Sequence, residues 1–155
     1  MRVLVVSDTH HDQWALHRAL AAQPTAEVVV HLGDGEDEAE QAKKAFPKKQ
    51  FYLVRGNCDW GSHLPASLTA EIGGRRFFMT HGYAEQVKYG LYRVEQAARE
   101  NGAQILLFGH THEPLTEYDD GLYILNPGSL HGSMGTYGYV DLTEAGIVTN
   151  IVHLH

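Results

Sequence analysis

The chain has 155 residues, a formal net charge of −7 at pH 7, 43% hydrophobic and 20% charged residues, and one cysteine. This length suits one domain over residues 1–155, and the composition argues against an intrinsically disordered chain. The acidic net charge argues against stable nucleic-acid binding. No apolar run approaches the roughly 20 residues of a membrane-spanning helix. A lone cysteine excludes an internal disulfide framework. We therefore expect a soluble cytoplasmic domain that begins directly with a strand, without a signal peptide or a membrane partner.

Short apolar runs alternate with helical segments in the first half of the chain. The pattern predicts strands at residues 3–7, 27–32 and 51–55, and helices at residues 12–22 and 36–46. Such alternation implies βαβ units and a largely parallel sheet. The run Val28-Val29-Val30 fits a strand that is buried on both faces.

The acidic residues 36–40 open the second predicted helix. Carboxylates favour the positive end of a helix dipole, and Lys43 and Lys44 follow near the other end. A cation site is one interpretation of this segment. A solvated helix face is the preferred one, because charge runs usually face water.

The second half is richer in strands. Ser67–Ile72 and Arg75–Thr80 are predicted to form a hairpin around Gly73-Gly74. A helix at residues 89–100 and a strand at residues 104–108 follow. The β-rich tail has a turn at Asp119-Asp120-Gly121 within residues 118–123, and antiparallel strands at residues 137–142 and 147–154 flank another turn at residues 144–146. The sum is an α/β sandwich with a mixed sheet and an antiparallel, β-rich C-terminal part.

Five of the predicted strands run directly into side chains that can bind a metal ion. These side chains are Asp8 and His10, Asp34, Asn57, His81, and His110 with His112. Ligands in open α/β sheets bind beyond the carboxyl ends of the strands, so the five motifs are expected to converge there. Two of the motifs place donors two residues apart, which in an extended chain puts both on one side. The adjoining glycines, Gly33, Gly56, Gly82 and Gly109, allow sharp turns and close backbone approach.

Each motif also has an ordinary explanation. A histidine after a strand is usually a hydrogen-bonded surface or core residue, a Gly-Asp pair is usually a turn, and Asn57 tolerates left-handed backbone. Five such coincidences at strand exits favour a metal site over turn chemistry. The mixture of imidazole, carboxylate and amide donors suits Mn²⁺, Fe²⁺, Zn²⁺ or Ni²⁺ and suits Ca²⁺ poorly.

In this order the residues resemble the signature of the calcineurin-like metallophosphoesterase superfamily: Asp-x-His, Gly-Asp, Gly-Asn, a lone His and Gly-His-x-His. The match extends to Asn126-Pro127-Gly128-Ser129. The small size and the Gly-Asn-Cys-Asp variant resemble the compact, single-domain prokaryotic phosphodiesterase branch. The resemblance implies a four-layer αββα sandwich and hydrolysis of a small phosphodiester or phosphate ester. In that reaction a water or hydroxide that bridges two divalent metals attacks phosphorus in line.

The resemblance also implies which residues bind each ion. One metal would take Asp8, His10 and His112, and the other would take Asn57, His81 and His110. Asp34 would bridge them, since a carboxylate has an oxygen for each ion. Mn²⁺ is the expected metal, with Fe²⁺, Zn²⁺, Ni²⁺ or Mg²⁺ as alternatives. Bound cations would reverse the local charge of an acidic chain, so the net charge does not exclude an anionic substrate.

One position departs from the family pattern. Many members carry His after the Gly-Asn asparagine, where it is thought to protonate the leaving group, and this chain has Cys58. A thiol is a weak hydrogen-bond donor, so activated phosphodiesters should react better than alkyl monoesters. The alternative interpretation is that Cys58 is only a small packing residue. Asp59 is expected to support the loop by hydrogen bonds. Asp34, Asn57, Cys58 and Asp59 thus form the predicted catalytic group.

Residues outside the motifs carry weaker expectations. Trp60 and His63 could reach the cleft from their loop, His11 is expected to point away from it, and no arginine is aimed at it because Arg55 is assigned to a strand. The remaining histidines have no motif support: His17, His31, His131, His153 and His155.

Two other functions compete with the enzyme. A non-catalytic scaffold or interaction protein of the same fold would not need every metal-ligand position filled. A purely structural metal site would usually be closed by Cys and His. A homo-oligomer is possible, but the sequence indicates no interface.

Overall fold

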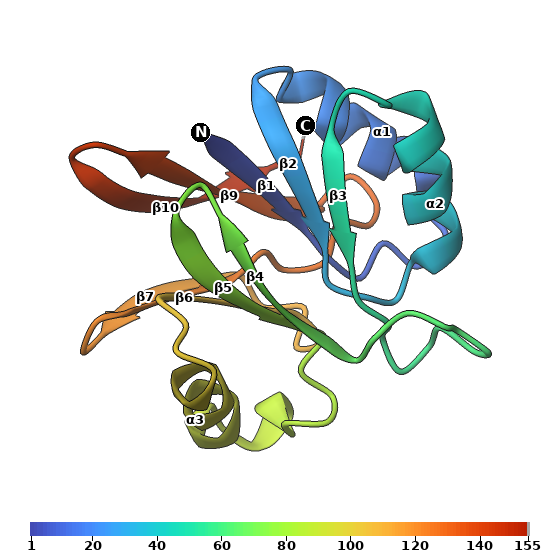
Figure 1. Cartoon of the computed structure of the whole chain (residues 1–155). Helices are drawn as coiled ribbons and strands as arrows, with labels where there is room; N and C mark the ends of the chain where they lie inside the picture. The colour runs from blue at the N-terminus through green and yellow to red at the C-terminus, as the bar shows by residue number, and fades with distance from the viewer. Residues whose placement is uncertain (155) are drawn as a thin grey trace.

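Two five-stranded β-sheets pack face to face in the structure, a computed structural model that describes residues 1–154 (Figure 1). Helices α1 (Gln13–Ala22) and α2 (Glu36–Ala45) cover the outer face of one sheet. Helix α3 (Tyr92–Glu100) covers the outer face of the other. These layers form the expected αββα sandwich. His155 lies outside the described residues, so its prediction has no structural counterpart.

The first sheet has the strand order β10-β9-β1-β2-β3. Its strands are β1 (Arg2–Val6), β2 (Ala26–His31), β3 (Gln50–Leu53), β9 (Thr136–Thr143) and β10 (Gly146–His153). The three N-terminal strands are parallel, and β9 and β10 add an antiparallel hairpin beside β1. The carboxyl ends of β1, β2 and β3 therefore lie at one edge of this sheet.

The second sheet has the order β4-β5-β6-β8-β7. Its strands are β4 (Ser67–Ile72), β5 (Arg75–Thr80), β6 (Ile105–Phe108), β7 (Leu115–Asp119) and β8 (Leu122–Asn126). Strands β5, β6 and β8 are parallel, and antiparallel partners flank them on both sides. The hairpin predicted around Gly73-Gly74 is present as β4 and β5.

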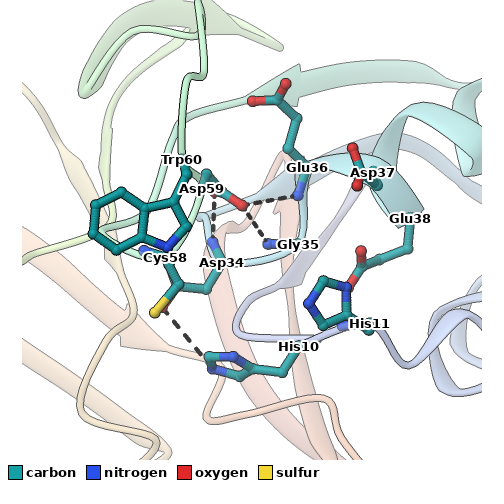
Figure 2. A pocket seen from close by; sticks show the side chains of 10 residues that line it. All are labelled: His10, His11, Asp34, Gly35, Glu36, Asp37, Glu38, Cys58, Asp59 and Trp60. Carbon is teal, nitrogen blue, oxygen red and sulfur yellow. Dashed lines mark hydrogen bonds and ion pairs between the residues drawn. The ribbon is translucent and has the colours of Figure 1, made fainter.

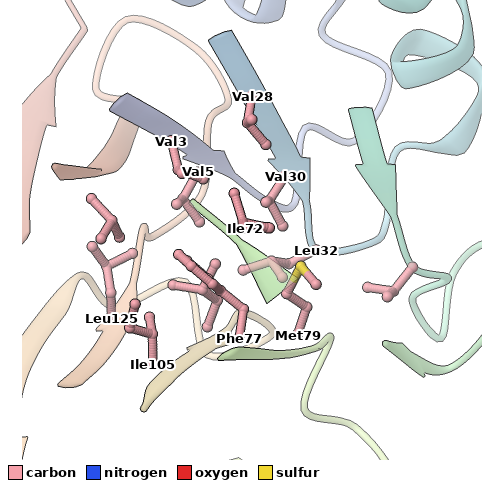
Figure 3. Close-up of a cluster of buried hydrophobic side chains, with 13 residues drawn as sticks. Val3, Val5, Val28, Val30, Leu32, Ile72, Phe77, Met79, Ile105 and Leu125 are labelled. Atoms are coloured by element: carbon pink, nitrogen blue, oxygen red, sulfur yellow. The ribbon is translucent and has the colours of Figure 1, made fainter. Parts of the chain in front are cut away.

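Alternate residues of the central strands supply two different cores. Val3 and Val5 face the second sheet (Figure 3), whereas Leu4 and Val6 face α1. All four are fully buried. Burial of one such side chain stabilises the fold by roughly 1.5–3 kcal/mol. Double-sided burial explains why these strands are continuous apolar runs, as predicted for residues 28–30.

The structure shifts some of the predicted boundaries. The helix expected from residue 89 begins at Tyr92, because a short 3₁₀ helix, η1 (Val87–Tyr89), ends at Gly90 with φ +140°. The turn expected at Asp119-Asp120-Gly121 is present, and it joins β7 to β8 in an antiparallel hairpin. None of the helices in the described part of the chain is long and apolar enough to span a membrane.

Candidate metal centre

The carboxyl ends of the parallel strands of both sheets meet at one edge of the sandwich, and the five motifs lie there. Strands β1, β2, β5 and β6 end just before their motifs, whereas β3 ends at Leu53 and reaches its motif through a short loop. Donor atoms that follow different strands lie within 4.8 Å of one another in three groups. The structure therefore brings the motifs together as their position at strand ends predicted.

Asp8, His10 and His112 form the first group. Asp8 Oδ1 lies 3.2 Å from His112 Nε2 and 3.7 Å from His10 Nε2, and the two imidazole nitrogens are 3.4 Å apart. Two donors of one ion have separations of this order when each bond is about 2.1 Å long. Asp8 is fully buried, while both histidines are partly exposed. The group is thus open on its histidine side.

Asn57, His81 and His110 form a second group around His81 Nε2. This nitrogen lies 3.0 Å from Asn57 Oδ1 and 3.2 Å from His110 Nδ1. The other ring nitrogen, Nδ1, donates to the carbonyl oxygen of Leu32 at 2.7 Å. That hydrogen bond fixes the ring and turns the lone pair of Nε2 toward the site.

Asp34 lies between the two groups. Its Oδ2 is 3.3 Å from His81 Nε2 and 3.9 Å from His10 Nε2, and its Oδ1 accepts a hydrogen bond from the Cys58 amide at 2.7 Å. Burial would raise the pKa of Asp34, but its hydrogen bond to His81, the charge of His81 and the Cys58 amide together hold that pKa well below its ordinary value. The carboxylate is therefore charged at neutral pH.

The polar atoms of the site fit divalent cations. Asp8 Oδ1 is buried and has no hydrogen-bond donor among residues 1–154, although a buried carboxylate oxygen without a partner is costly. Burial lowers the pKa of His81, but Asp34 and Asp8 outweigh burial and raise it. The same negative field would attract a cation, and a cation would give the orphaned oxygen of Asp8 a partner.

The backbone of the loops that carry these donors is not extended like that of the preceding strands. Asp8, His10, His110 and His112 have φ values of +54°, +43°, +72° and +63°. The expectation that alternate residues share a side because the chain is extended was therefore wrong. Left-handed turns bring Asp8 and His10 together and direct His110 and His112 to different donor groups. Asp and His are among the side chains that tolerate this conformation best. The backbone of Asp34, with φ +60°, adopts the same conformation.

Two glycines permit the close packing of these loops. A Cβ atom on Gly56 would lie 2.1 Å from Asp34 Oδ1, and one on Gly109 would lie 2.2 Å from Ser7 Oγ. Neither position has room for a side chain. The glycines thus allow protein groups, rather than a ligand, to approach the backbone.

Asp59 supports the site through hydrogen bonds, as the sequence suggested. Its carboxylate accepts the backbone N–H groups of Asp34, Gly35 and Glu36 at 2.8–3.2 Å (Figure 2). It also accepts the N–H group of Gly56 at 2.8 Å. Gly35 is the N-cap of helix α2 and Glu36 is its first residue, so the carboxylate also interacts with the positive end of that helix. One side chain therefore connects the loop that carries Asn57 to the loop that carries Asp34.

Cys58 is exposed, and its Sγ lies within 4.8 Å of donor atoms of His10 and Asp34. Partial burial and the negative charge of Asp34 raise the pKa of the thiol, so it stays protonated at neutral pH. A protonated thiol beside the site can donate only a weak hydrogen bond.

A cavity of about 480 Å³ opens beside His10, Asp34 and Cys58 (Figure 2). Of the two loop residues that could reach the cleft, Trp60, which is 90% exposed, lines this cavity, whereas His63 is not among its lining residues. His11 also lines this cavity, so the expectation that it points away was wrong. The left-handed backbone of His11, φ +70°, is the reason.

A smaller cavity of about 130 Å³ lies beside Asn57, His81 and Tyr83. Arg55 is among its lining residues, and the prediction that placed Arg55 within a strand was wrong. Strand β3 ends at Leu53, so Arg55 belongs to the loop, and its guanidinium donates to the carbonyl oxygen of Leu64 at 2.6 Å. Tyr83 packs edge-on against His110 at 5.5 Å between ring centroids, a contact that no sequence signal indicated.

The segment that includes Asn126 and Ser129 forms hydrogen bonds with the loops that carry the metal-ligand candidates. Ser129 Oγ donates to the carbonyl oxygen of Asp8 at 2.7 Å, and Asn126 Nδ2 donates to Thr111 Oγ1 at 2.9 Å. In the sequence, this segment stands out only because it resembles the family signature, and that resemblance indicates no role for these residues. His131, which had no motif support, lies near His10, with ring centroids 6.5 Å apart.

Comparison with known proteins links this geometry to a family. A family model described as the calcineurin-like phosphoesterase superfamily domain matches residues 1–145. The probable metallophosphoesterase YsnB of Bacillus subtilis is 33% identical over 130 residues, which is 84% of this chain and 75% of YsnB. Phosphodiesterase YfcE of Escherichia coli is 29% identical over 168 aligned positions, which cover 91% of this chain and 88% of YfcE. A Streptococcus pneumoniae structure described as a predicted phosphoesterase has a TM-score of 0.83 at 24% identity, covers 98% of this chain and 88% of its own, and shows the fold.

Proposed function

This chain belongs to the calcineurin-like phosphoesterase superfamily, and we propose that it is a binuclear metal-dependent phosphodiesterase that uses the seven motif residues as ligands. One ion would be held by Asp8, His10 and His112, and the other by Asn57, His81 and His110. The observation that carries the proposal is the position of Asp34, whose Oδ2 lies 3.3 Å from a donor of one group and 3.9 Å from a donor of the other. A bridging carboxylate must occupy such a place.

The protein groups have separable tasks in this reaction. Two divalent cations would supply an activated water for in-line attack and would neutralise charge on the phosphoryl oxygens. Asp34 stays ionised because of its partners, and Asp59 fixes the loops of Asp34 and Asn57. Cys58 offers the departing oxygen only a weak proton donor, so esters with good leaving groups should react best.

The larger cavity limits the choice of substrate. Five of its ten lining residues are carboxylates and none is lysine or arginine: the acidic members are Asp34, Glu36, Asp37, Glu38 and Asp59. Even with two bound cations, such a wall would disfavour substrates with many negative charges. A small, singly charged phosphodiester suits the cavity, and stable binding of nucleic acid does not.

Mn²⁺ is the metal that we propose, because the mixed imidazole, carboxylate and amide donors suit it; Fe²⁺, Zn²⁺, Ni²⁺ and Mg²⁺ are the alternatives. We place the enzyme in the cytoplasm, where its single cysteine would stay reduced. A homo-oligomer is compatible with the exposed aromatic residues around α3, such as Tyr89 and Tyr92, which are 91% and 78% exposed.

The decisive experiment removes and restores the metal. The chelator-stripped protein should not hydrolyse bis-p-nitrophenyl phosphate, and added Mn²⁺ should restore turnover. Asp34→Ala and Asn57→Ala should each reduce kcat/KM by at least about 100-fold, since each removes a ligand. Glu71→Ala, an exposed change beside the β4–β5 turn and at the end of the hairpin opposite His81, is the control and should keep full activity.

The same experiment tests the scaffold alternative. Absence of Mn²⁺-dependent turnover with diester and monoester substrates, with both ligand variants indistinguishable from the parent, would favour a non-catalytic protein. The filled set of seven ligand positions argues against that outcome, because a scaffold has no need for it.

A further inference from the structure

Glu38 differs from its acidic neighbours on α2. The sequence assigned residues 36–40 to a solvated helix face, and Asp37 is indeed exposed. Glu38 is only 3% exposed, so that assignment is wrong for this residue. A carboxylate is buried only when its surroundings supply hydrogen bonds or charge. The partners of Glu38 therefore indicate what it does.

The partners of Glu38 flank the proposed ligand His10 on both sides. Glu38 Oε2 accepts a hydrogen bond from Thr9 Oγ1 at 2.7 Å and another from the His11 amide at 2.6 Å. Both donors meet the same oxygen. The carboxylate thus holds the residues immediately before and after His10, and it reaches them from the helix that follows Asp34.

A buried histidine orients the hydroxyl in this contact. The Gly33 amide donates to His31 Nδ1 at 3.1 Å, so the proton of the neutral ring is on Nε2. His31 Nε2 therefore donates to Thr9 Oγ1 at 3.0 Å, and the hydroxyl proton of Thr9 is directed to Glu38. The chain of donors runs in one direction and ends on the carboxylate.

The loop that carries His10 needs such support. His10 and His11 have φ values of +43° and +70°, and each non-glycine residue in this region costs on the order of 1 kcal/mol or more. Strained backbone of this kind persists only where its surroundings impose it. The start of α2 does so closely, since a Cβ on Gly35 would lie 1.9 Å from Thr9 Oγ1.

We propose that Glu38 is a positioning residue that holds His10 in its metal-binding geometry through Thr9 and the His11 amide. The inference rests on the proposed function, in which His10 is a ligand. Glu38 does not need to bind the ion itself, because its Oε2 is occupied by two protein donors. Asp59 acts in a similar way on the loop of Asn57, so α2 would fix both halves of the site.

The test measures metal binding directly. Calorimetric titration with Mn²⁺ of the stripped parent, Glu38→Ala and Glu38→Gln should show two sites in the parent. Glu38→Ala should weaken one site by about 10- to 100-fold. In Glu38→Gln the amide oxygen can still accept both hydrogen bonds, so Mn²⁺ affinity should stay within about threefold of the parent. Glu40→Ala, a half-exposed position paired with Lys43 on the same helix, is the matched control and should bind like the parent.

A double-mutant cycle with His10→Ala separates positioning from general stability. If Glu38 acts through His10, then Glu38→Ala should cause no further loss of Mn²⁺ affinity in the His10→Ala background. Additive losses would overturn the proposal, and so would a Glu38→Ala protein that is less stable but binds both ions like the parent. Should Glu38→Ala fail to fold, Thr9→Val removes one of the two donors with little change in volume and should weaken the same site by about threefold or more. Unchanged Mn²⁺ affinity in Thr9→Val would then refute the proposal. A parent protein that binds no Mn²⁺ would instead refute the proposed function.

Discussion

Gly56→Ala should displace the carboxylate that we propose as the bridge between two metals. The added Cβ would lie 2.1 Å from Asp34 Oδ1 and 2.4 Å from the Asp34 amide nitrogen, whereas ordinary contacts begin at 3.4 Å. Both distances are at least 1 Å too short, and one of the two atoms belongs to the backbone. Asp34 cannot simply rotate away, because its amide donates to Asp59 and its Oδ1 accepts from the Cys58 amide.

The size of the effect follows from this displacement. A shift of about 1 Å in a catalytic group can reduce the rate roughly 100-fold. Overpacking and weakened hydrogen bonds to Asp59 should also lower the free energy of unfolding by about 2–4 kcal/mol. We therefore expect kcat/KM for bis-p-nitrophenyl phosphate to fall about 100-fold at saturating Mn²⁺, together with weaker Mn²⁺ binding.

Gly61→Ala is the matched control for this change. Gly61 lies on the same loop, and a Cβ there would meet no atom within 4 Å. Its φ of +71° means that alanine should cost about 1 kcal/mol of stability but leave kcat/KM within about twofold. Urea unfolding and steady-state kinetics on both variants provide the comparison. If Gly56→Ala keeps parental kcat/KM and Mn²⁺ affinity, the tight packing on Asp34 is not needed for the site.

Three further predictions concern the leaving group, the metal and the pH dependence of stability. Cys58→His should raise the ratio of alkyl to aryl phosphodiester turnover at least about tenfold, because imidazole is a better proton donor than a thiol; an unchanged ratio would show that leaving-group protonation does not depend on this position. Chelation of the metal should lower the melting temperature, since Mn²⁺ at 100 times its Kd adds about 2.7 kcal/mol, and identical melting curves with and without Mn²⁺ would contradict the site. Asp12 caps α1 through the Ala15 amide at 2.9 Å and accepts from the Gly132 amide at 2.7 Å, so Asp12→Ala should reduce the free energy of unfolding by about 1–2 kcal/mol at pH 7. Burial raises the pKa of Asp12 but these amides lower it further, so this contribution is complete above its ordinary value of 3.8 and is lost as pH falls through the depressed pKa. Urea titrations of both proteins from pH 7 to pH 2.5 should converge, and a constant gap would exclude the charge as its source.

The positions of the strands and of the donor residues were available from the sequence. Apolar runs such as residues 28–30 and a turn such as Gly73-Gly74 express local preferences, and donors that follow several strands point to one sheet edge. The metal-ligand motifs were predicted on that basis, whereas the αββα layers were implied by the resemblance to the metallophosphoesterase superfamily. The assignment of each ligand to one ion remains a prediction.

The tertiary structure decided how those residues are held. Left-handed backbone at His10 replaced the extended chain that spacing suggested, and the end of β3 at Leu53 freed Arg55 to line a cavity. Glu38 meets Thr9 across 29 residues, and Ser129 meets Asp8 across 121. Whether a carboxylate on a helix faces water or a ligand loop depends on which distant segment packs against it. Local sequence preferences do not indicate which distant segment that is, so the contacts that hold the metal-binding loops are visible only in the folded chain.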